Sequence, residues 1–320
     1  MKKVAVVLAL LTAVLQVAAA KRDPAYRDAR RNGALAKIEL HVADDEGTPV
    51  GEAEVKVFLG MNFRPKGRWV KGMTDTNGVF VAEGRTCGDE IEVFVTKAGY
   101  YDSRVKYCYA PMGAEHEVSD GKWQPYGAEE TIELRMIKHP LALSLSGDFS
   151  YTKRLNEWIG YDIETHDFVA PHGAGKNTDF EVSIDWNGDW YPDYKGMGVR
   201  LRFTEPYSGY YFSTMHGSSV FKGPYAADPQ GDYLKEARFY EEKTGDGQAL
   251  RHRFDKDNCW VVRSRCKVDK DGRLLAANYS IVYLVSFCGT PYKSGGIRVF
   301  GAFNPTPNDT NLEPKREGAR

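Results

Sequence analysis

The first hundred residues decide the fold through three segments, ADDEGTPVGEAEVKVF (43–58), TDTNGVFVAE (74–83) and EIEVFVTKAGYY (90–101). Apolar residues alternate with polar ones in them, as at Val55 and Val57, which is the period of a strand buried on one face. Several short strands of this kind bury their apolar side chains between two sheets. The segments therefore predict an antiparallel β-sandwich.

Turn residues separate these strands. Gly47 and Pro49 lie between the first two, where glycine tolerates a positive φ and proline fixes the following corner. Asn77-Gly78 is a strong hairpin signal, because a two-residue I′ turn needs positive φ at both positions. The sequence therefore predicts a two-residue hairpin turn at Asn77-Gly78.

These strands and turns resemble the carboxypeptidase regulatory-like, or transthyretin-like, domain. The resemblance rests on DEGTPVGEAEV (45–55), TDTNGVF (74–80) and VTKAGY (95–100), and it extends over residues 36–137. It implies a small prealbumin-like sandwich that accompanies other domains, often on secreted or envelope proteins. It implies no catalytic residue in this part of the chain.

The rest of the chain is also rich in strand patterns, so the whole protein is expected to be all-β, with a second sandwich-like domain after the first. Alternation marks 179–186 and 198–203, and a long hairpin is expected from 259–268 and 273–287, with the second arm central in its sheet. Residues 233–243 fit a helix or a strand equally. The expected organisation is a signal peptide at 1–20, an N-terminal arm at 21–35, a first sandwich at 36–138, a second domain at 139–304 and a disordered tail at 305–320.

The N-terminus has the features of a secretory signal peptide. Lys2 and Lys3 precede an apolar run at 4–17, and Ala18-Ala19-Ala20 forms a small-residue cleavage site. A membrane anchor is the alternative, but the run is shorter than the roughly 20 residues that a span needs, and no later stretch could cross a bilayer. The sequence predicts cleavage after Ala20 and export to the periplasm, the extracellular space or the cell surface.

The charge balance bears on the class of partner, and the cysteine content bears on the possible disulfide bonds. The 43 basic and 44 acidic residues nearly cancel, so nothing favours a nucleic-acid partner. In an exported protein, Cys87 and Cys108 bracket one strand region of the first domain and are a candidate disulfide. Cys259, Cys266 and Cys288 allow at most one further pair, whose connectivity stays open.

Two loop segments carry possible metal ligands. Asp185, Asp189 and Asp193 could supply oxygen ligands for calcium, although the EF-hand spacing fails and a solvated turn explains the segment better. His166 and His172, with the aspartates beside them, could bind a transition metal, but exposed loop histidines are the favoured interpretation. The sequence thus predicts no cofactor, with calcium as the weaker alternative.

Aromatic residues in glycine- and proline-rich loops of the second domain are the main functional signal. Flat rings stack on the apolar faces of sugars, and Tyr and Trp add a hydrogen-bonding group. The alternative is that these rings fill the core of the domain. The candidate residues are Trp186, Trp190, Tyr191, Tyr194, Tyr207, Tyr210, Tyr211 and Tyr225.

Motifs for catalysis are missing from the sequence: it has no GxSxG elbow, phosphate loop, dinucleotide fingerprint or zincin motif. The favoured hypothesis is therefore an exported, non-catalytic protein that binds a glycan or an envelope or surface partner. One alternative is a polysaccharide hydrolase that uses Asp185, Asp189 and Glu205. Another is a purely structural envelope component that binds a second protein.

Overall fold

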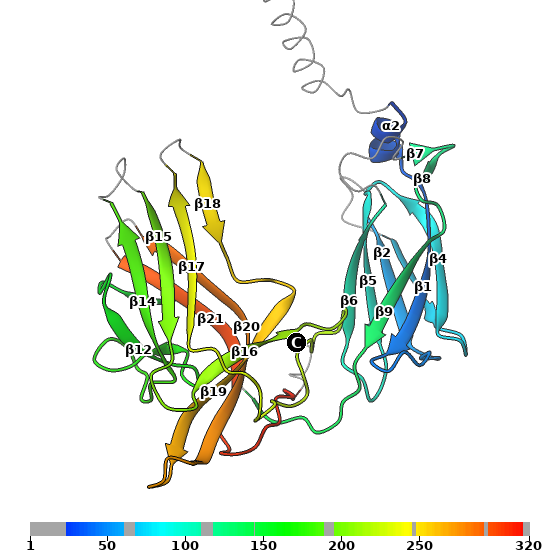
Figure 1. The fold of residues 1–320 in the computed structure, drawn as a ribbon. Helices are drawn as coiled ribbons and strands as arrows, with labels where there is room; N and C mark the ends of the chain where they lie inside the picture. The colour runs from blue at the N-terminus through cyan, green and yellow to red at the C-terminus, as the bar shows by residue number, and fades with distance from the viewer. Residues whose placement is uncertain are drawn as a thin grey trace, which may run out of the picture. The chain divides into compact units, whose positions relative to one another are not determined.

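The structure is a computed structural model that describes residues 24–60, 68–109, 118–143, 145–188, 195–244, 248–290 and 294–315. This part is almost entirely β-strand, which confirms the all-β fold class (Figure 1). The chain divides into two compact units, unit 1 with Met1–Met136 and Gly217–Val220, and unit 2 with the remainder. Among the described elements, no helix is long and apolar enough to cross a membrane. The expected signal peptide lies outside the described residues.

Unit 1 is a sandwich of two sheets. One sheet has the order β4 (Val79–Thr86), β1 (Ala34–Asp44), β8 (Lys122–Trp123) and β7 (Val118–Ser119), with β9 (Ala128–Leu134) also paired with β1. The other has the order β3 (Arg68–Met73), β2 (Glu54–Leu59), β5 (Glu90–Thr96) and β6 (Ser103–Cys108). β8 and β9 run parallel to β1, and the other pairs are antiparallel.

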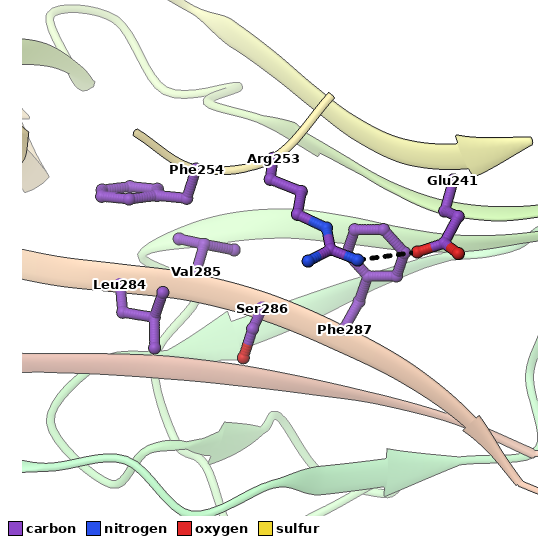
Figure 2. Close-up of a pocket in the computed structure, with 7 residues that line it drawn as sticks. All are labelled: Glu241, Arg253, Phe254, Leu284, Val285, Ser286 and Phe287. Carbon is purple, nitrogen blue, oxygen red and sulfur yellow. Dashed lines mark hydrogen bonds and ion pairs between the residues drawn. The ribbon is translucent and has the colours of Figure 1, made fainter. Parts of the chain in front are cut away.

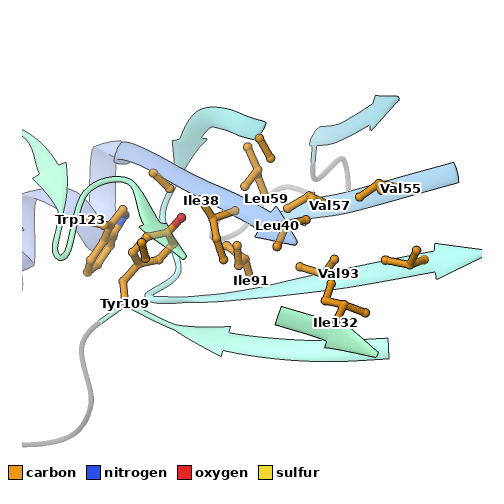
Figure 3. Packing of buried hydrophobic residues seen from close by; sticks show 14 of the residues in the cluster. Ile38, Leu40, Val55, Val57, Leu59, Ile91, Val93, Tyr109, Trp123 and Ile132 are labelled. Atoms are coloured by element: carbon orange, nitrogen blue, oxygen red, sulfur yellow. The ribbon is translucent and has the colours of Figure 1, made fainter. Parts of the chain in front are cut away.

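The predicted alternation builds the core of unit 1. Val55, Val57 and Leu59 of β2 point inward and are buried, as is Ile38 of β1 on the opposing sheet. Figure 3 shows these side chains meeting between the strands. Full burial of such a side chain contributes about 1.5–3 kcal/mol, so this layer stabilises the unit.

The N-terminal arm packs on this sandwich as a helix, α2 (Pro24–Asn32). Gly33 ends the helix with φ of 82°, a conformation that glycine adopts without strain. Tyr26 is buried and lies edge-on against Trp123, with 5.8 Å between ring centroids.

The turn at Asn77-Gly78 differs from the predicted hairpin. Asp75 Oδ1 accepts the N–H groups of Asn77 and Val79 at 2.9 and 2.8 Å, and Gly78 has φ of 75°. The strands on either side, β3 and β4, belong to different sheets. The prediction of a two-residue hairpin was wrong, because an aspartate side chain organises a turn that carries the chain from one sheet to the other.

The predicted disulfide between Cys87 and Cys108 is not formed, and all five cysteines are thiols. Cys87 is buried directly after β4, and its Sγ lies 3.9 Å from the carbonyl oxygen of Arg31. Cys108 is exposed at the end of β6, in the other sheet. The prediction failed because the two cysteines bracket a strand region in sequence while their own strands lie in different sheets.

One edge of the second sheet of unit 1 is covered by residues from far along the chain. Ser219 bridges Ser103 of β6, and the N–H of Val220 donates to the carbonyl oxygen of Asp102 at 2.8 Å. The domain boundary expected near residue 138 lies close to Met136, whereas the return of the chain at Gly217–Val220 carried no sequence signal.

Unit 2 is also built from two sheets. Sheet E has the order β10 (Leu145–Ser146), β21 (Ser294–Asn304), β20 (Leu274–Thr290), β19 (Asn258–Val268) and β16 (Gly209–Thr214), with β11 (Ser150–Thr152) also on β21. Sheet F has the order β13 (Asp167–Phe168), β12 (Trp158–Asp162), β14 (Phe180–Asn187), β15 (Gly196–Arg202), β17 (Glu236–Lys243) and β18 (Ala249–His252). The predicted hairpin is β19–β20, β20 is central as expected, and residues 236–243 are strand.

Sheet E is buried on both faces, which explains the continuous apolar run in β20. Val282 packs into the core that sheet F covers, and Ile281 packs on the other face with Leu143 and Leu312. The carboxylate of Glu313 accepts the N–H of His139 at 2.6 Å. Residues 305–315 are therefore packed, although their proline content suggested a disordered tail; residues 316–320 lie outside the described part.

The connection after β14 is eight residues long. β14 and β15 pair as far as Asn187 and Gly196, so residues 188–195 connect them. Gly188 has φ of 90°, and residues 189–194 lie outside the described residues.

Candidate functional site

The predicted aromatic residues do not gather on one surface in the part of the chain that the structure describes. Tyr210 and Tyr211 are neighbours on β16, so their side chains point to opposite faces. Tyr210 is buried between the sheets, whereas Tyr211 packs on the outer face of sheet E against Tyr233, with centroids 5.3 Å apart.

The other candidates are held by local contacts. Tyr207 is exposed, and its hydroxyl donates to the carbonyl oxygen of Gly272 at 2.8 Å. Trp186 packs on the core between the sheets, and Tyr225 lies against Phe221. Trp190, Tyr191 and Tyr194 lie outside the described residues.

The carboxylates considered for calcium or for hydrolysis are engaged elsewhere. Asp185 accepts hydrogen bonds from Arg200 Nε at 2.6 Å and Nη2 at 2.9 Å, while Asp189 and Asp193 lie outside the described residues. Glu205 Oε2 accepts the N–H of Cys266 at 3.1 Å. The calcium prediction is not carried further, because its one described ligand is neutralised by an arginine.

The two aspartates beside His166 and His172 are held by different contacts. Asp167 accepts the N–H groups of Phe168 and Ala174, each at 2.8 Å. Asp162 belongs to a buried ion-pair cluster with Asp179, in which Arg265 donates to Asp162 Oδ1 at 2.9 Å and to Asp179 Oδ1 at 3.0 Å. His166 Nδ1 lies 3.3 Å from the carbonyl oxygen of Val299, and His172 is exposed. Within the described ranges, no three His, Cys, Asp or Glu side chains come together as metal ligands.

A different feature of unit 2 has the geometry of a binding site: a groove between β16 and β17. Tyr210 N–H donates to the carbonyl oxygen of Leu234 at 3.0 Å, and Leu234 N–H returns a bond of 2.7 Å. Beyond this point β16 continues in sheet E, while β17 joins sheet F. A groove of about 430 Å³ opens where the strands diverge, lined by Tyr210, Phe212, Glu236, Ala237, Arg238, Phe239, Tyr240, His252 and Trp260.

Stacked rings form the wall of this groove. Trp260 of β19 lies 3.9 Å from Tyr210 at an interplanar angle of 26°, and 5.6 Å from Phe239 at 28°. Phe212 stands at the rim and is 53% exposed. A ring pair at the distance of Trp260 and Phe239 is favourable by about 0.5–1.5 kcal/mol beyond the burial of its surface, so these contacts stabilise the wall.

One polar group in this wall is not satisfied. Trp260 is 2% exposed, and its indole N–H has no hydrogen-bond acceptor among the described residues. The hydroxyl of Tyr210, by comparison, donates to the carbonyl oxygen of Glu236 at 3.1 Å. A buried donor without an acceptor costs about 1–3 kcal/mol, and such groups are rare in folded proteins.

The rim of the groove is polar. His252 stacks on Phe239 with 5.8 Å between centroids, and the guanidinium of Arg238 lies 4.8 Å from the centre of the Tyr240 ring. His252 and Arg238 are both exposed. The groove therefore combines an apolar aromatic wall with charged and hydrogen-bonding groups at its mouth.

A second, smaller recess of about 340 Å³ is lined by Phe254, Glu241, Arg253 and residues 284–287 of β20 (Figure 2). Phe254 lines the recess and packs on Trp260, with centroids 5.1 Å apart. Arg253 Nη2 and Arg251 Nη2 donate to Glu241 at 2.9 and 3.0 Å, and these bonds lower the pKa of the Glu241 carboxyl. The recess contains a paired charge, unlike the groove, which contains an unpaired donor.

The groove could not be recognised from sequence. Trp260 lies in CWVVRSRCKV, where it is indistinguishable from an ordinary core residue. Its position becomes distinctive only because β16 and β17 separate beside it. Of the groove residues, only Tyr210 was among the predicted aromatic candidates.

Comparison with known proteins gives limited information. No protein-family model and no curated protein matches the sequence. Solved structures that match include catechol 1,2-dioxygenase from Acinetobacter radioresistens (16% identity, TM-score 0.27) and 3-chlorocatechol 1,2-dioxygenase from Rhodococcus opacus (12%, 0.26). The matches cover 35% and 33% of this chain, and 55% and 62% of those enzymes. The chain thus spans little more than half the length of the proteins it matches.

These matches contradict several predictions. The proteins named are enzymes of the dioxygenase class, and none is described as a carbohydrate-binding protein. The names of these matches contradict the prediction of a non-catalytic glycan-binding protein and the expectation of no cofactor, and neither is proposed again; the hydrolase and purely structural alternatives are not carried further. At these TM-scores the likeness assigns no reaction, substrate or cofactor to this chain.

Proposed function

We propose that unit 2 binds a small planar organic molecule in the groove between β16 and β17. The observation that supports this proposal is the indole N–H of Trp260, which is buried in the groove wall without an acceptor. The N–H is shielded from solvent in this structure, so a ligand oxygen or nitrogen must displace the side chains that cover it in order to accept this hydrogen bond and remove the cost of the unsatisfied donor. The free energy of binding then includes the relief of the penalty that the unsatisfied donor causes in the empty groove.

The lining of the groove defines the class of ligand. Phe212, which is 53% exposed, offers a flat apolar surface in front of the buried rings of Trp260 and Phe239, so an aromatic ring fits better than an aliphatic chain of equal size. The single orphan donor selects ligands with one acceptor beside the ring, such as an aromatic amide or ketone. Pockets of this kind, apolar with few polar groups, are typical of small-molecule sites.

Isothermal titration calorimetry on the mature chain tests the proposal with benzamide and acetophenone as probes and cyclohexanecarboxamide as the aliphatic control. We expect saturable binding of the aromatic probes and weaker binding of the aliphatic one. Trp260→Phe keeps a ring in the wall but removes the donor, and should weaken binding about tenfold, which corresponds to about 1.4 kcal/mol.

The matched control is Trp158→Phe, which changes a tryptophan outside the groove lining. It should leave binding unchanged. Absence of binding to any aromatic probe, or equal binding by Trp260→Phe and wild type, would show that the groove is not the site.

We further propose that the protein acts after export, with residues 36–138 as a carboxypeptidase regulatory-like supporting domain. The Lys2-Lys3 start, the apolar run at 4–17 and the Ala18-Ala19-Ala20 site support export. N-terminal sequencing of the protein recovered from its native host should begin at Lys21. A chain that retains Met1 or Lys2 contradicts export by this route.

A further inference from the structure

The outer face of the second sheet of unit 1 carries a cluster of aromatic rings. Trp69 of β3 lies 5.0 Å from Phe58 of β2 and 5.7 Å from Phe94 of β5, measured between ring centroids. These residues alternate with the buried residues of their strands, so they face away from the core. The signal was present in the sequence, because aromatic residues at the outward positions of half-buried strands are not needed for the core.

The cluster is exposed at the edge of the sheet. Trp69 is 44% exposed, and Met73, on the same face of β3, is 55% exposed. β3 ends the sheet order β3-β2-β5-β6, and no other described strand pairs with its outer side. The opposite edge, β6, is covered by Gly217–Val220. One edge of this sheet is thus closed by the chain itself and the other is open.

The charges around the cluster are unevenly paired. On the same face, Lys56 pairs with Glu54 at 2.9 Å, Arg104 with Glu92 at 2.9 Å, and Lys106 with Glu90 at 2.8 Å. On β3 itself, Arg68 and Lys71 form no ion pair with any described residue, although the charge of Lys71 helps to lower the pKa of the Glu54 carboxyl. The open edge therefore combines exposed apolar surface with two positive charges, Lys71 on the aromatic face of the strand and Arg68 on the other face.

We propose that β3 is a docking edge for an extended, acidic segment of a partner protein. The segment adds as a further strand beside β3: on the outward face, apolar side chains pack on Trp69 and Met73 and a carboxylate between them pairs with Lys71, while a carboxylate on the other face pairs with Arg68. Exposed strand edges are the usual sites of such strand addition, and tryptophan and arginine dominate binding at protein interfaces. This inference is independent of the groove in unit 2.

The charge pattern favours a different protein over a second copy of this chain. Pairing two copies of β3 would bring Arg68 and Lys71 of both chains together, and lysine on an edge strand is a common protection against such pairing. An acidic partner segment turns the same residues into favourable contacts. The positive charges of Arg68 and Lys71 thus favour an acidic segment of another protein over a second copy of β3.

Display of random 12-residue peptides on the mature full-length chain tests the proposal. The expected selection is a motif in which two apolar residues flank an acidic residue at every second position, so that all three face Trp69, Lys71 and Met73. A synthetic peptide of this motif should bind at least tenfold more weakly to Trp69→Ala, and Lys71→Glu should weaken binding unless an acid of the peptide is exchanged for lysine. N-methylation of the peptide amides that face β3 should abolish binding, whereas methylation of the alternate amides should not.

The control is Val81→Ala, which removes an exposed apolar residue from the other sheet of unit 1 and should not change binding. Far-UV circular dichroism verifies that each variant is folded. The proposal is overturned if no motif is selected, or if the selected peptides bind Trp69→Ala as tightly as wild type. It is also overturned if Trp69 governs binding to anionic phosphatidylglycerol vesicles or dimerisation of the chain in place of peptide binding.

Discussion

Two buried polar sites of unit 2 contrast in how completely their hydrogen bonds are satisfied. Around Arg265, the carboxylates of Asp162 and Asp179 accept bonds from the guanidinium, from Ser264 Oγ at 2.7 Å and from backbone N–H groups such as that of Ile163 at 2.8 Å. Beside the groove, Trp260 offers a donor that nothing described accepts. The first arrangement is complete within the fold, whereas the second lacks an acceptor, which in our proposal a ligand supplies.

The difference indicates what each site contributes. The Arg265 cluster lies at a bulge of β19, where Arg265 has φ of 52°, a conformation that costs an ordinary residue about 1–2 kcal/mol. Its dense bonding holds this backbone and fixes the loops after β12 and before β14. We infer that the cluster stabilises unit 2. The unsatisfied N–H of Trp260, by contrast, lowers the stability of the unit and in our proposal remains available for a ligand.

The largest effect is expected from breaking the satisfied cluster. Arg265→Met leaves Asp162 and Asp179 buried without their cation, and removal of one partner of a buried pair costs about 3–5 kcal/mol. Urea unfolding, followed by tryptophan fluorescence from unit 2, measures this loss.

Arg154→Met is the matched control for this substitution. Its partner Glu157 lies 3.1 Å away, and both side chains are more than half exposed, so the loss should stay below about 1 kcal/mol. If Arg265→Met is no more destabilising than Arg154→Met, the cluster does not stabilise the unit.

Parts of this contrast could be predicted from sequence and parts could not. The β19–β20 hairpin followed from alternation and the turn at Asp269–Gly272, and the central position of β20 followed from its apolar run. Asp162 and Asp179, by contrast, are joined to Arg265 from about a hundred residues away. Local patterns carry no information on such a pairing, which is why Asp162, beside His166, resembled a metal ligand.

The groove was hidden for a related reason. A tryptophan in an apolar strand has the same local pattern whether its N–H finds an acceptor or not. Trp123 is buried like Trp260, yet its N–H donates to the carbonyl oxygen of Thr86 at 3.0 Å. Only the tertiary arrangement separates a satisfied indole from an unsatisfied one.

For this pair of tryptophans we expect a difference in unfolding free energy that is smaller than the effect of Arg265→Met. Trp123→Phe loses a made hydrogen bond and leaves the Thr86 carbonyl group buried without it, whereas Trp260→Phe removes a donor that had no acceptor. Both lose similar ring volume, so Trp123→Phe should be more destabilising by about 1–3 kcal/mol. Urea midpoints of the two variants, each measured on the transition of its own unit, provide the comparison.

Equal losses in the two variants would mean that Trp260 has an acceptor in solution, such as bound water. In that case the contrast with the Arg265 cluster fails, and the support for ligand binding fails with it. A ligand titration on the same samples separates the outcomes, because Trp260→Phe should lose binding while Trp123→Phe keeps it.

The smallest effect on stability is expected at the recess, where Glu241 is paired with arginines but is partly exposed to solvent. Arg253 and Arg251 hold its carboxyl at a lowered pKa, so the ion pairs stabilise the folded state above the unfolded pKa of about 4.3. This stability is lost as pH falls through the lower, folded pKa. Glu241→Gln should therefore cost less than about 0.5 kcal/mol at pH 7, because the site is partly exposed and screened by solvent. Thermal unfolding of both proteins between pH 7 and pH 3 should converge at the acidic end, and parallel curves across this range would show that the ion pairs contribute nothing.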